Sequence, residues 1–128
     1  MDMQKTILLA DDDELLAALL TFRLQKGGYS VVWCRDGREV KVQLAKAMPD
    51  MIVSDIMMPY FSGIELLDYV RKELGSPTPI IIISSAGNEE NVMSAFELGA
   101  NDFISKPVSP AELLIRVARE LNKTKVGY

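Results

Sequence analysis

The chain has 128 residues, a length typical of a single domain, with 48% apolar residues, 25% charged residues and a net charge of −4. This acidic balance argues against nucleic-acid binding through a broad basic face. The absence of histidine excludes imidazole metal ligands, Ser-His and Cys-His catalysis, and a phosphohistidine on this chain. The lone Cys34 excludes an internal disulfide, and no apolar run suits a membrane span or a signal peptide. We therefore expect a cytoplasmic protein.

Short apolar runs alternate with longer segments that carry helix signals. Several of the runs are apolar at successive residues, as expected for strands buried on both faces of a parallel sheet. Five strand–helix units predict an α/β fold, namely a doubly wound (βα)5 flavodoxin-like three-layer sandwich with a parallel five-stranded sheet in the order 2-1-3-4-5. The expected strands cover residues 5–10, 29–34, 51–55, 79–84 and 102–105.

Helix starts and stops are marked along the chain. A capping side chain stands three residues before a glutamate in "DGRE" (36–39), "SGIE" (62–65) and "SPAE" (109–112). Asp13 is the expected N-cap of the first helix, and glycines mark the expected helix ends. With no linker or repeat in sight, we expect one domain over residues 1–128, with a core of about 5–123 and no output domain in this chain.

Polar side chains follow the expected strands at the point where each strand ends. Because the carboxyl ends of parallel strands meet at one edge of the sheet, we expect these side chains to lie together. Three carboxylates with no nitrogen or thiolate ligand favour a hard ion such as Mg²⁺. A lysine and a hydroxyl opposite would complete a cradle for a phosphoryl group. The side chains concerned are Asp11, Asp12, Asp55, Ser84, Ser85 and Lys106.

Four motifs carry a resemblance to a known family. The chain resembles the receiver domain of two-component response regulators, including chemotaxis receivers, over nearly its whole length. The motifs stand in order and at fitting separations, and together they are highly specific. They are "ILLADD" (7–12), "IVSDIMMP" (52–59), "IIISSA" (81–86) and "ELGANDFISKP" (97–107).

The resemblance implies a role for each matching residue. Asp55 corresponds to the phosphoryl acceptor, a carboxylate nucleophile that forms an acyl phosphate. The implied metal ligands are Asp11, Asp12, Asp55 and the backbone carbonyl of Met57, with Mg²⁺ as the cofactor and Mn²⁺ able to substitute. The remaining implied roles are a phosphoryl contact for Lys106, a switch pair formed by Ser85 and Phe103, and a cis bond between Lys106 and Pro107.

The implied function is a signalling switch that catalyses only its own phosphorylation and dephosphorylation. The expected donor is a phosphohistidine on a sensor histidine kinase or a histidine phosphotransfer protein. Phosphorylation would alter the surface formed by the fourth helix, the fifth strand and the fifth helix, which an unidentified downstream partner or domain would read. We expect no direct nucleic-acid binding by this chain and no contact with a membrane.

Other functions remain open at this stage. The run "DDD" (11–13) also suits a haloacid-dehalogenase-like phosphatase with Asp11 as nucleophile, although this would leave Asp55 unexplained. Acidic residues after the first strand would repel the phosphate of a flavin, which argues against an electron carrier. A receiver-like binding module that cannot be phosphorylated is a further alternative.

Some residues have two interpretations. Tyr60 and Phe61, beside the predicted site, suit either a docking patch or packing of their loop. Trp33 is expected to serve strand packing. Glu97, Asp102 and Arg116 resemble the dimer residues of winged-helix regulators. The fourth helical segment, however, has no lysine or arginine over residues 88–98 to complete such a salt-bridged dimer.

Overall fold

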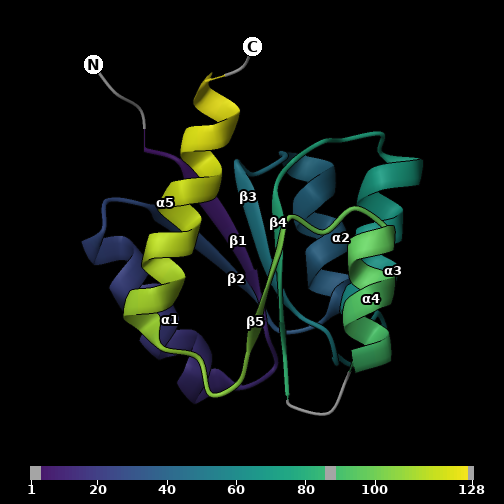
Figure 1. The fold of residues 1–128 in the computed structure, drawn as a ribbon, viewed down its shortest axis with the longest axis horizontal. Helices are drawn as coiled ribbons and strands as arrows, with labels where there is room; N and C mark the ends of the chain where they lie inside the picture. The colour runs from purple at the N-terminus through teal and green to yellow at the C-terminus, as the bar shows by residue number, and fades with distance from the viewer. Residues whose placement is uncertain (1–3, 86–88, 127–128) are drawn as a thin grey trace.

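A parallel five-stranded sheet forms the centre of the protein (Figure 1). The computed structural model describes residues 4–85 and 89–126. The strand order β2-β1-β3-β4-β5 confirms the predicted order, and the fold is the predicted flavodoxin-like α/β sandwich. The strands are β1 (Thr6–Ala10), β2 (Ser30–Cys34), β3 (Met51–Asp55), β4 (Ile80–Ser84) and β5 (Asp102–Ser105).

Helices cover both faces of the sheet. Figure 1 shows α1 and α5 on one face and α2, α3 and α4 on the other. None of the helices, over the residues that the structure describes, is long and apolar enough to cross a membrane. Their bounds are α1 (Glu14–Lys26), α2 (Gly37–Lys46), α3 (Gly63–Asp68), α4 (Glu89–Glu97) and α5 (Pro110–Val126).

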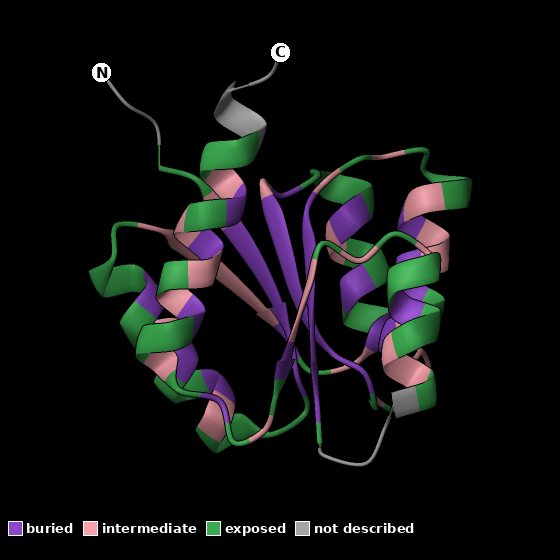
Figure 2. Ribbon diagram, in the orientation of Figure 1, coloured by how far each residue is buried: buried purple, intermediate pink, exposed green. Residues whose placement is uncertain are grey.

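The apolar strands divide their side chains between two cores. Because successive side chains of a strand point to opposite faces, Ile7 and Leu9 pack on the α1/α5 side, whereas Leu8 and Ala10 pack on the other side. Every residue of β3 and β4 is buried, as the runs of successive apolar residues predicted. Figure 2 shows this buried sheet between helices whose outer faces are exposed. The sheet therefore holds its strand ends in a rigid frame.

The helix caps largely follow the sequence signals. Asp13 accepts a hydrogen bond from the Leu16 backbone N–H at 3.1 Å, which confirms it as the N-cap of α1. Ser62 and Glu65 form a reciprocal capping box at the start of α3. At α2 the box is incomplete. Asp36 caps the helix, but Glu39 accepts from the backbone N–H of Arg35.

The third helix ends in a π-helical turn that no sequence signal predicted. After α3 the chain continues as a π-helical turn, η1 (Tyr69–Glu73), which turns Arg71 toward the neighbouring loops. The Arg71 guanidinium donates to the carbonyls of Ser76, Thr78 and Gly99 and to Asn101 Oδ1. Burial lowers the pKa of Arg71. This side chain therefore ties the end of the third helical segment to the turn that follows α4.

Candidate functional site

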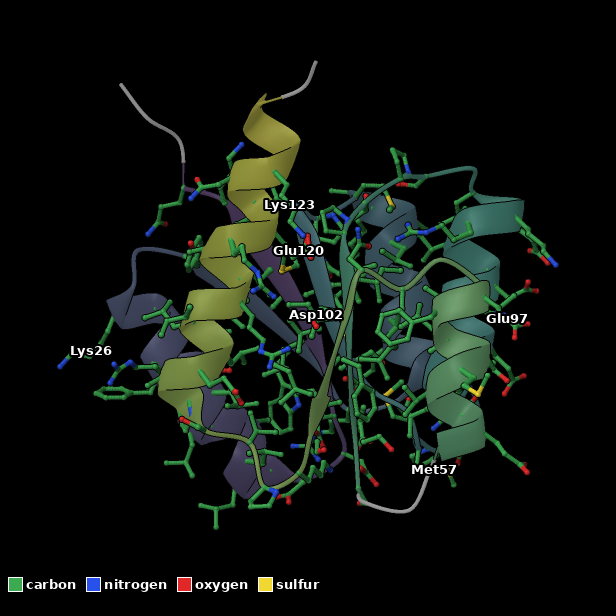
Figure 3. The ribbon with its side chains drawn as sticks, viewed as in Figure 1. Lys26, Met57, Glu97, Asp102, Glu120 and Lys123 are labelled. Atoms are coloured by element: carbon green, nitrogen blue, oxygen red, sulfur yellow. The ribbon has the colours of Figure 1, made fainter. Side chains whose placement is uncertain are left out.

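The carboxyl ends of the strands bring the predicted polar residues to one rim of the sheet. Asp11 follows the last residue of β1, Asp55 is the last residue of β3, and Lys106 follows the last residue of β5. Met57, in the loop after β3, lies at the same end of the molecule (Figure 3). We call Asp11, Asp12, Asp55 and Lys106 the rim cluster.

Three carboxylates of the rim cluster converge. Asp11, Asp12 and Asp55 each offer an oxygen atom, and these atoms lie within 4.8 Å of one another. Asp11 and Asp55 are 0% and 5% exposed, whereas Asp12 faces solvent. The sequence placed the two adjacent aspartates in one site, and the structure distinguishes a buried carboxylate from an accessible one.

One oxygen of this cluster is left without a hydrogen bond. Asp11 Oδ1 accepts from the backbone N–H of Asp13 at 2.9 Å. Asp11 Oδ2 is the one buried side-chain polar atom, among the described residues, that has no hydrogen-bond partner. A buried carboxylate oxygen in this state is costly, and a hard cation satisfies it without supplying a proton. The donor set of carboxylate oxygens therefore fits Mg²⁺ or Mn²⁺.

Lys106 provides the positive charge of the cluster. Its Nζ donates to Asp55 Oδ2 at 2.9 Å and lies 3.9 Å from Asp11 Oδ2. Burial alone lowers the pKa of Lys106, but the hydrogen bond and charge of Asp55, with Asp11, outweigh it and raise the pKa. For the acid Asp11 burial acts in the other direction, and it is the main cause of the raised pKa of this carboxyl group. The lysine thus stays charged, and one cation faces three carboxylates.

The loop after β3 holds Asp55 in place. Asp55 Oδ1 accepts a hydrogen bond from the backbone N–H of Met57 at 3.2 Å. In the separate loop after β5, the Lys106–Pro107 peptide bond is cis, as the family resemblance implied. A Cβ atom at Gly63 would lie 2.6 Å from the backbone oxygen of Asp55, so only glycine lets α3 begin this close to the strand. This role of Gly63 was not predicted, although the glycine inside the capping motif "SGIE" was a visible signal in the sequence.

The two aromatic residues of this loop divide between the two expected interpretations. Phe61 packs against α2, where a Cβ at Gly37 would overlap its ring, and Lys41 Nζ lies 4.5 Å from the ring centroid. Tyr60 is 70% exposed, and the Arg38 guanidinium carbon lies 3.9 Å from its ring centroid. Its φ of 70° is unusual for a residue other than glycine. Phe61 therefore serves loop packing, and Tyr60 is the exposed member.

The remaining predicted residues lie as follows. Ser84 is buried and donates to the backbone oxygen of Ser85, whereas the Ser85 side chain is exposed. Phe103 is partly buried and packs against the core on the α2–α4 face. Ala86, the last residue of the motif "IIISSA", lies outside the described residues. Trp33 packs against the α1/α5 core as predicted, and its indole also donates to the backbone oxygen of Asp11 at 2.8 Å, a contact the sequence did not reveal.

Comparisons with known proteins agree with this architecture. Residues 7–118 match the family model described as the response regulator receiver domain. The alkaline phosphatase synthesis transcriptional regulatory protein PhoP of Bacillus subtilis (strain 168) is 35% identical over 125 residues, which cover 98% of this chain and 52% of PhoP. The receiver domain of the Francisella response regulator 1452 has a TM-score of 0.88 at 35% identity, covering 94% of this chain and 99% of that one.

The fold and the rim cluster define a doubly wound α/β protein with a carboxylate–lysine centre at its strand ends. The chain belongs to the response regulator receiver domain family of two-component systems. The phosphate regulon transcriptional regulatory protein PhoB of Pseudomonas aeruginosa is also 35% identical, over 96% of this chain and 54% of PhoB. This chain thus spans about half the length of the curated relatives it matches.

Proposed function

We propose that this chain is a phosphorylation-controlled switch in which Asp55 accepts a phosphoryl group. The observation that carries the proposal is the position of Asp55. It accepts a hydrogen bond from Lys106 Nζ at 2.9 Å, and it lies with the carboxylates of Asp11 and Asp12 beside an Asp11 oxygen that has no hydrogen bond. The carboxylates alone would repel a dianionic phosphoryl group, whereas Lys106 together with a cation held by the carboxylates would let it approach Asp55.

The transfer follows from this arrangement. An Asp55 carboxylate oxygen forms a bond to phosphorus as the bond from phosphorus to the donor imidazole nitrogen breaks, and the imidazole, which already carries a proton on its other ring nitrogen, leaves as the neutral ring. When bound by Asp11, Asp12, Asp55 and the Met57 carbonyl, Mg²⁺ or Mn²⁺ would supply positive charge beside the phosphoryl oxygens. Water later hydrolyses the acyl phosphate, so the protein acts on itself and turns over no separate substrate.

Lys106 and Ser85 are the proposed readers of the modification. A phosphoryl group adds charge and acceptor oxygens, so the Lys106 ammonium gains a partner beyond its present Asp55 oxygen. The exposed Ser85 hydroxyl follows β4 directly and would move onto the same oxygens. Phe103, on the neighbouring strand β5, would turn further into the core as Ser85 moves. The rearranged surface is that of α4, β5 and α5.

This surface is not arranged for a salt-bridged dimer in the present state. Arg116 donates to Asp102 Oδ1 at 2.9 Å, and Arg119 donates to Asp102 Oδ2 at 3.1 Å, so both arginines are bound within the chain. Glu97 points outward from α4 (Figure 3). Sedimentation of the phosphorylated and unphosphorylated protein tests whether phosphorylation changes the oligomeric state.

The partner that donates the phosphoryl group is proposed to be a histidine kinase or a phosphotransfer protein. An apolar stripe on α1 supports docking beside the rim, because Leu15, Leu19 and Phe22 follow helical spacing and are 72%, 52% and 61% exposed. Phe22→Ser should slow transfer from a phosphohistidine protein and leave transfer from acetyl phosphate unchanged. Val42→Ser removes an apolar side chain of similar exposure on α2 and should change neither rate.

The haloacid-dehalogenase-like phosphatase alternative has little support. Its nucleophile would be Asp11, which is fully buried and whose Oδ1 already accepts a backbone hydrogen bond.

The described residues form one sheet with two helical layers, which supports a single receiver domain over about residues 5–123. The output function is left to whichever partner or domain reads the α4–β5–α5 surface.

The direct test is the mass of the intact protein after incubation with Mg²⁺ and acetyl phosphate. We expect one acid- and base-labile phosphoryl group on the unaltered chain and none on Asp55→Asn. An adduct that survives Asp55→Asn and disappears in Asp11→Asn would favour the phosphatase instead. If no variant gains mass, a beryllofluoride titration distinguishes a binding module, which would not respond, from a receiver that hydrolyses its phosphate quickly.

A further inference from the structure

A tryptophan on the edge strand contacts the backbone of the rim cluster. Trp33 Nε1 donates a hydrogen bond to the backbone oxygen of Asp11 at 2.8 Å. The backbone N–H of Asp11 donates to the backbone oxygen of Cys34 at 3.1 Å. The peptide groups on both sides of Asp11 are therefore bonded to β2, one through the backbone and the other through an indole side chain.

The bond to the indole fixes the peptide unit between two metal-ligand candidates. The carbonyl of Asp11 and the N–H of Asp12 belong to one planar group, so holding the carbonyl fixes the direction in which the chain leaves Asp11 toward Asp12. These two aspartates and Asp55 carry like charges at close range, which favours rotation of the Asp11–Asp12 peptide away from the site. A hydrogen bond at this carbonyl opposes that rotation.

The indole is itself held in one orientation. Trp33 is partly buried and packs against the α1/α5 core, and the guanidinium carbon of Arg35 lies 5.1 Å from its ring centroid. Arg35 Nη2 in turn bonds Glu14 Oε1 at 3.0 Å, at the start of the helix that follows the aspartates. The ring therefore lies between the core and the Arg35 side chain, and these contacts favour the orientation in which its N–H reaches the Asp11 carbonyl.

We infer that Trp33 is a positioning residue for the metal site, which keeps Asp11 and Asp12 in a ligating arrangement before the cation arrives. The inference rests on the proposed Mg²⁺ site. Trp33 is not among the residues that would hold the cation or the phosphoryl group, and it would act through its hydrogen bond to the Asp11–Asp12 peptide. Its contribution lies in metal affinity, because the site then needs less reorganisation when it binds.

The test replaces the indole N–H and preserves the ring. Incorporation of β-(3-benzothienyl)alanine at position 33 puts sulfur in place of the N–H in a ring of nearly the same shape. We expect the Mn²⁺ affinity, measured from the electron paramagnetic resonance of free Mn²⁺, to weaken about threefold to tenfold, the usual effect of one lost hydrogen bond. Val31→Ala, a packing change on the same strand, should lower the melting temperature and leave the Mn²⁺ affinity unchanged.

A second readout follows the bond itself. Trp33 is the single tryptophan of the chain, so one indole cross-peak reports it in a nitrogen–proton correlation spectrum. Mg²⁺ should shift this peak in the unaltered protein and not in Asp12→Asn. An unshifted peak at saturating Mg²⁺, or unchanged Mn²⁺ affinity in the benzothienyl protein, would overturn the inference. If the unaltered protein binds no Mn²⁺ at all, the proposed metal site fails and the inference fails with it.

Discussion

Two groups of charged side chains in this protein differ in how completely their charges are paired. The rim cluster sets three carboxylates against Lys106, and a buried oxygen of Asp11 has no hydrogen bond. The second group, which we call the β5–α5 cluster, consists of Asp102, Glu112, Arg116 and Arg119, and Arg116 Nη2 lies 3.4 Å from Glu112 Oε2. Both oxygens of Asp102 are bonded there, one to each arginine.

The difference supports the proposal that the rim cluster binds a cation, whereas the β5–α5 cluster is a structural contact. In the β5–α5 cluster, burial alone lowers the pKa of Arg116, but the bond to Asp102 outweighs it and raises the pKa, so the charges stabilise one another without outside help. In the rim cluster the negative charge exceeds the positive, and burial raises the pKa of Asp11. The buried sheet around this incomplete cluster holds its charges together, and the proposed cation would complete it.

The largest effect should follow removal of the single cation of the rim cluster. Lys106→Met keeps the aliphatic stem and leaves three carboxylates unopposed, so in metal-free buffer we expect the free energy of unfolding to fall by about 2–4 kcal/mol. Urea denaturation measures this, and Mg²⁺ should restore part of the loss. Because the pKa of Lys106 is raised, its stabilising contribution is present below the ordinary value of 10.5 and disappears as pH rises through the raised value.

Removal of the charge on the buried aspartate should raise the free energy of unfolding rather than lower it. Asp11→Asn keeps an oxygen for the Asp13 N–H and removes a buried negative charge, so metal-free protein should gain about 1–3 kcal/mol of stability. The same variant should lose most of the stabilisation that Mg²⁺ gives the unaltered chain. Thermal melting with and without Mg²⁺ checks both, and equal or lower stability of the metal-free variant would contradict a strained cluster.

The pH dependence of that gain provides a control. The raised pKa of Asp11 means that the folded protein holds this proton at pH values where an unfolded aspartate, with a pKa of 3.8, has lost it. Ionisation of Asp11 therefore weakens the folded state as pH rises above 3.8. The advantage of Asp11→Asn should be small near pH 3 and grow toward neutral pH, as urea denaturation across that range would reveal. An advantage independent of pH would indicate a packing effect.

The smallest change in stability should follow a substitution in the β5–α5 cluster. Arg116→Ala leaves Asp102 its bond to Arg119, so we expect a loss of about 0.5–1 kcal/mol, typical of a partly exposed ion pair. Because the β5–α5 cluster has no empty position for a cation, Mg²⁺ should stabilise this variant as much as the unaltered chain. Calorimetric melting of the two proteins in parallel measures the difference. A loss of stability that Mg²⁺ reversed would contradict the view that the β5–α5 cluster does not bind the cation.

The amino-acid sequence by itself determined the fold class, the strand order and the meeting of Asp11, Asp12, Asp55 and Lys106. Runs of successive apolar residues identify doubly buried strands, and the carboxyl ends of parallel strands share one edge whatever the details of packing. The capping residues Asp13 and Ser62 were also visible, because a cap depends on neighbours within a few residues.

Only the tertiary structure decided which of the two adjacent aspartates is buried, which backbone carbonyls the Arg71 guanidinium contacts and which atom accepts the hydrogen bond of the Trp33 indole. Each of these depends on segments far apart in the chain. The indole of β2 meets the residue after β1, and Arg71 of η1 meets the turn after α4. Local patterns encode hydrogen bonds over a few residues, whereas contacts over 22 or 28 residues arise from the packing of whole elements against the sheet.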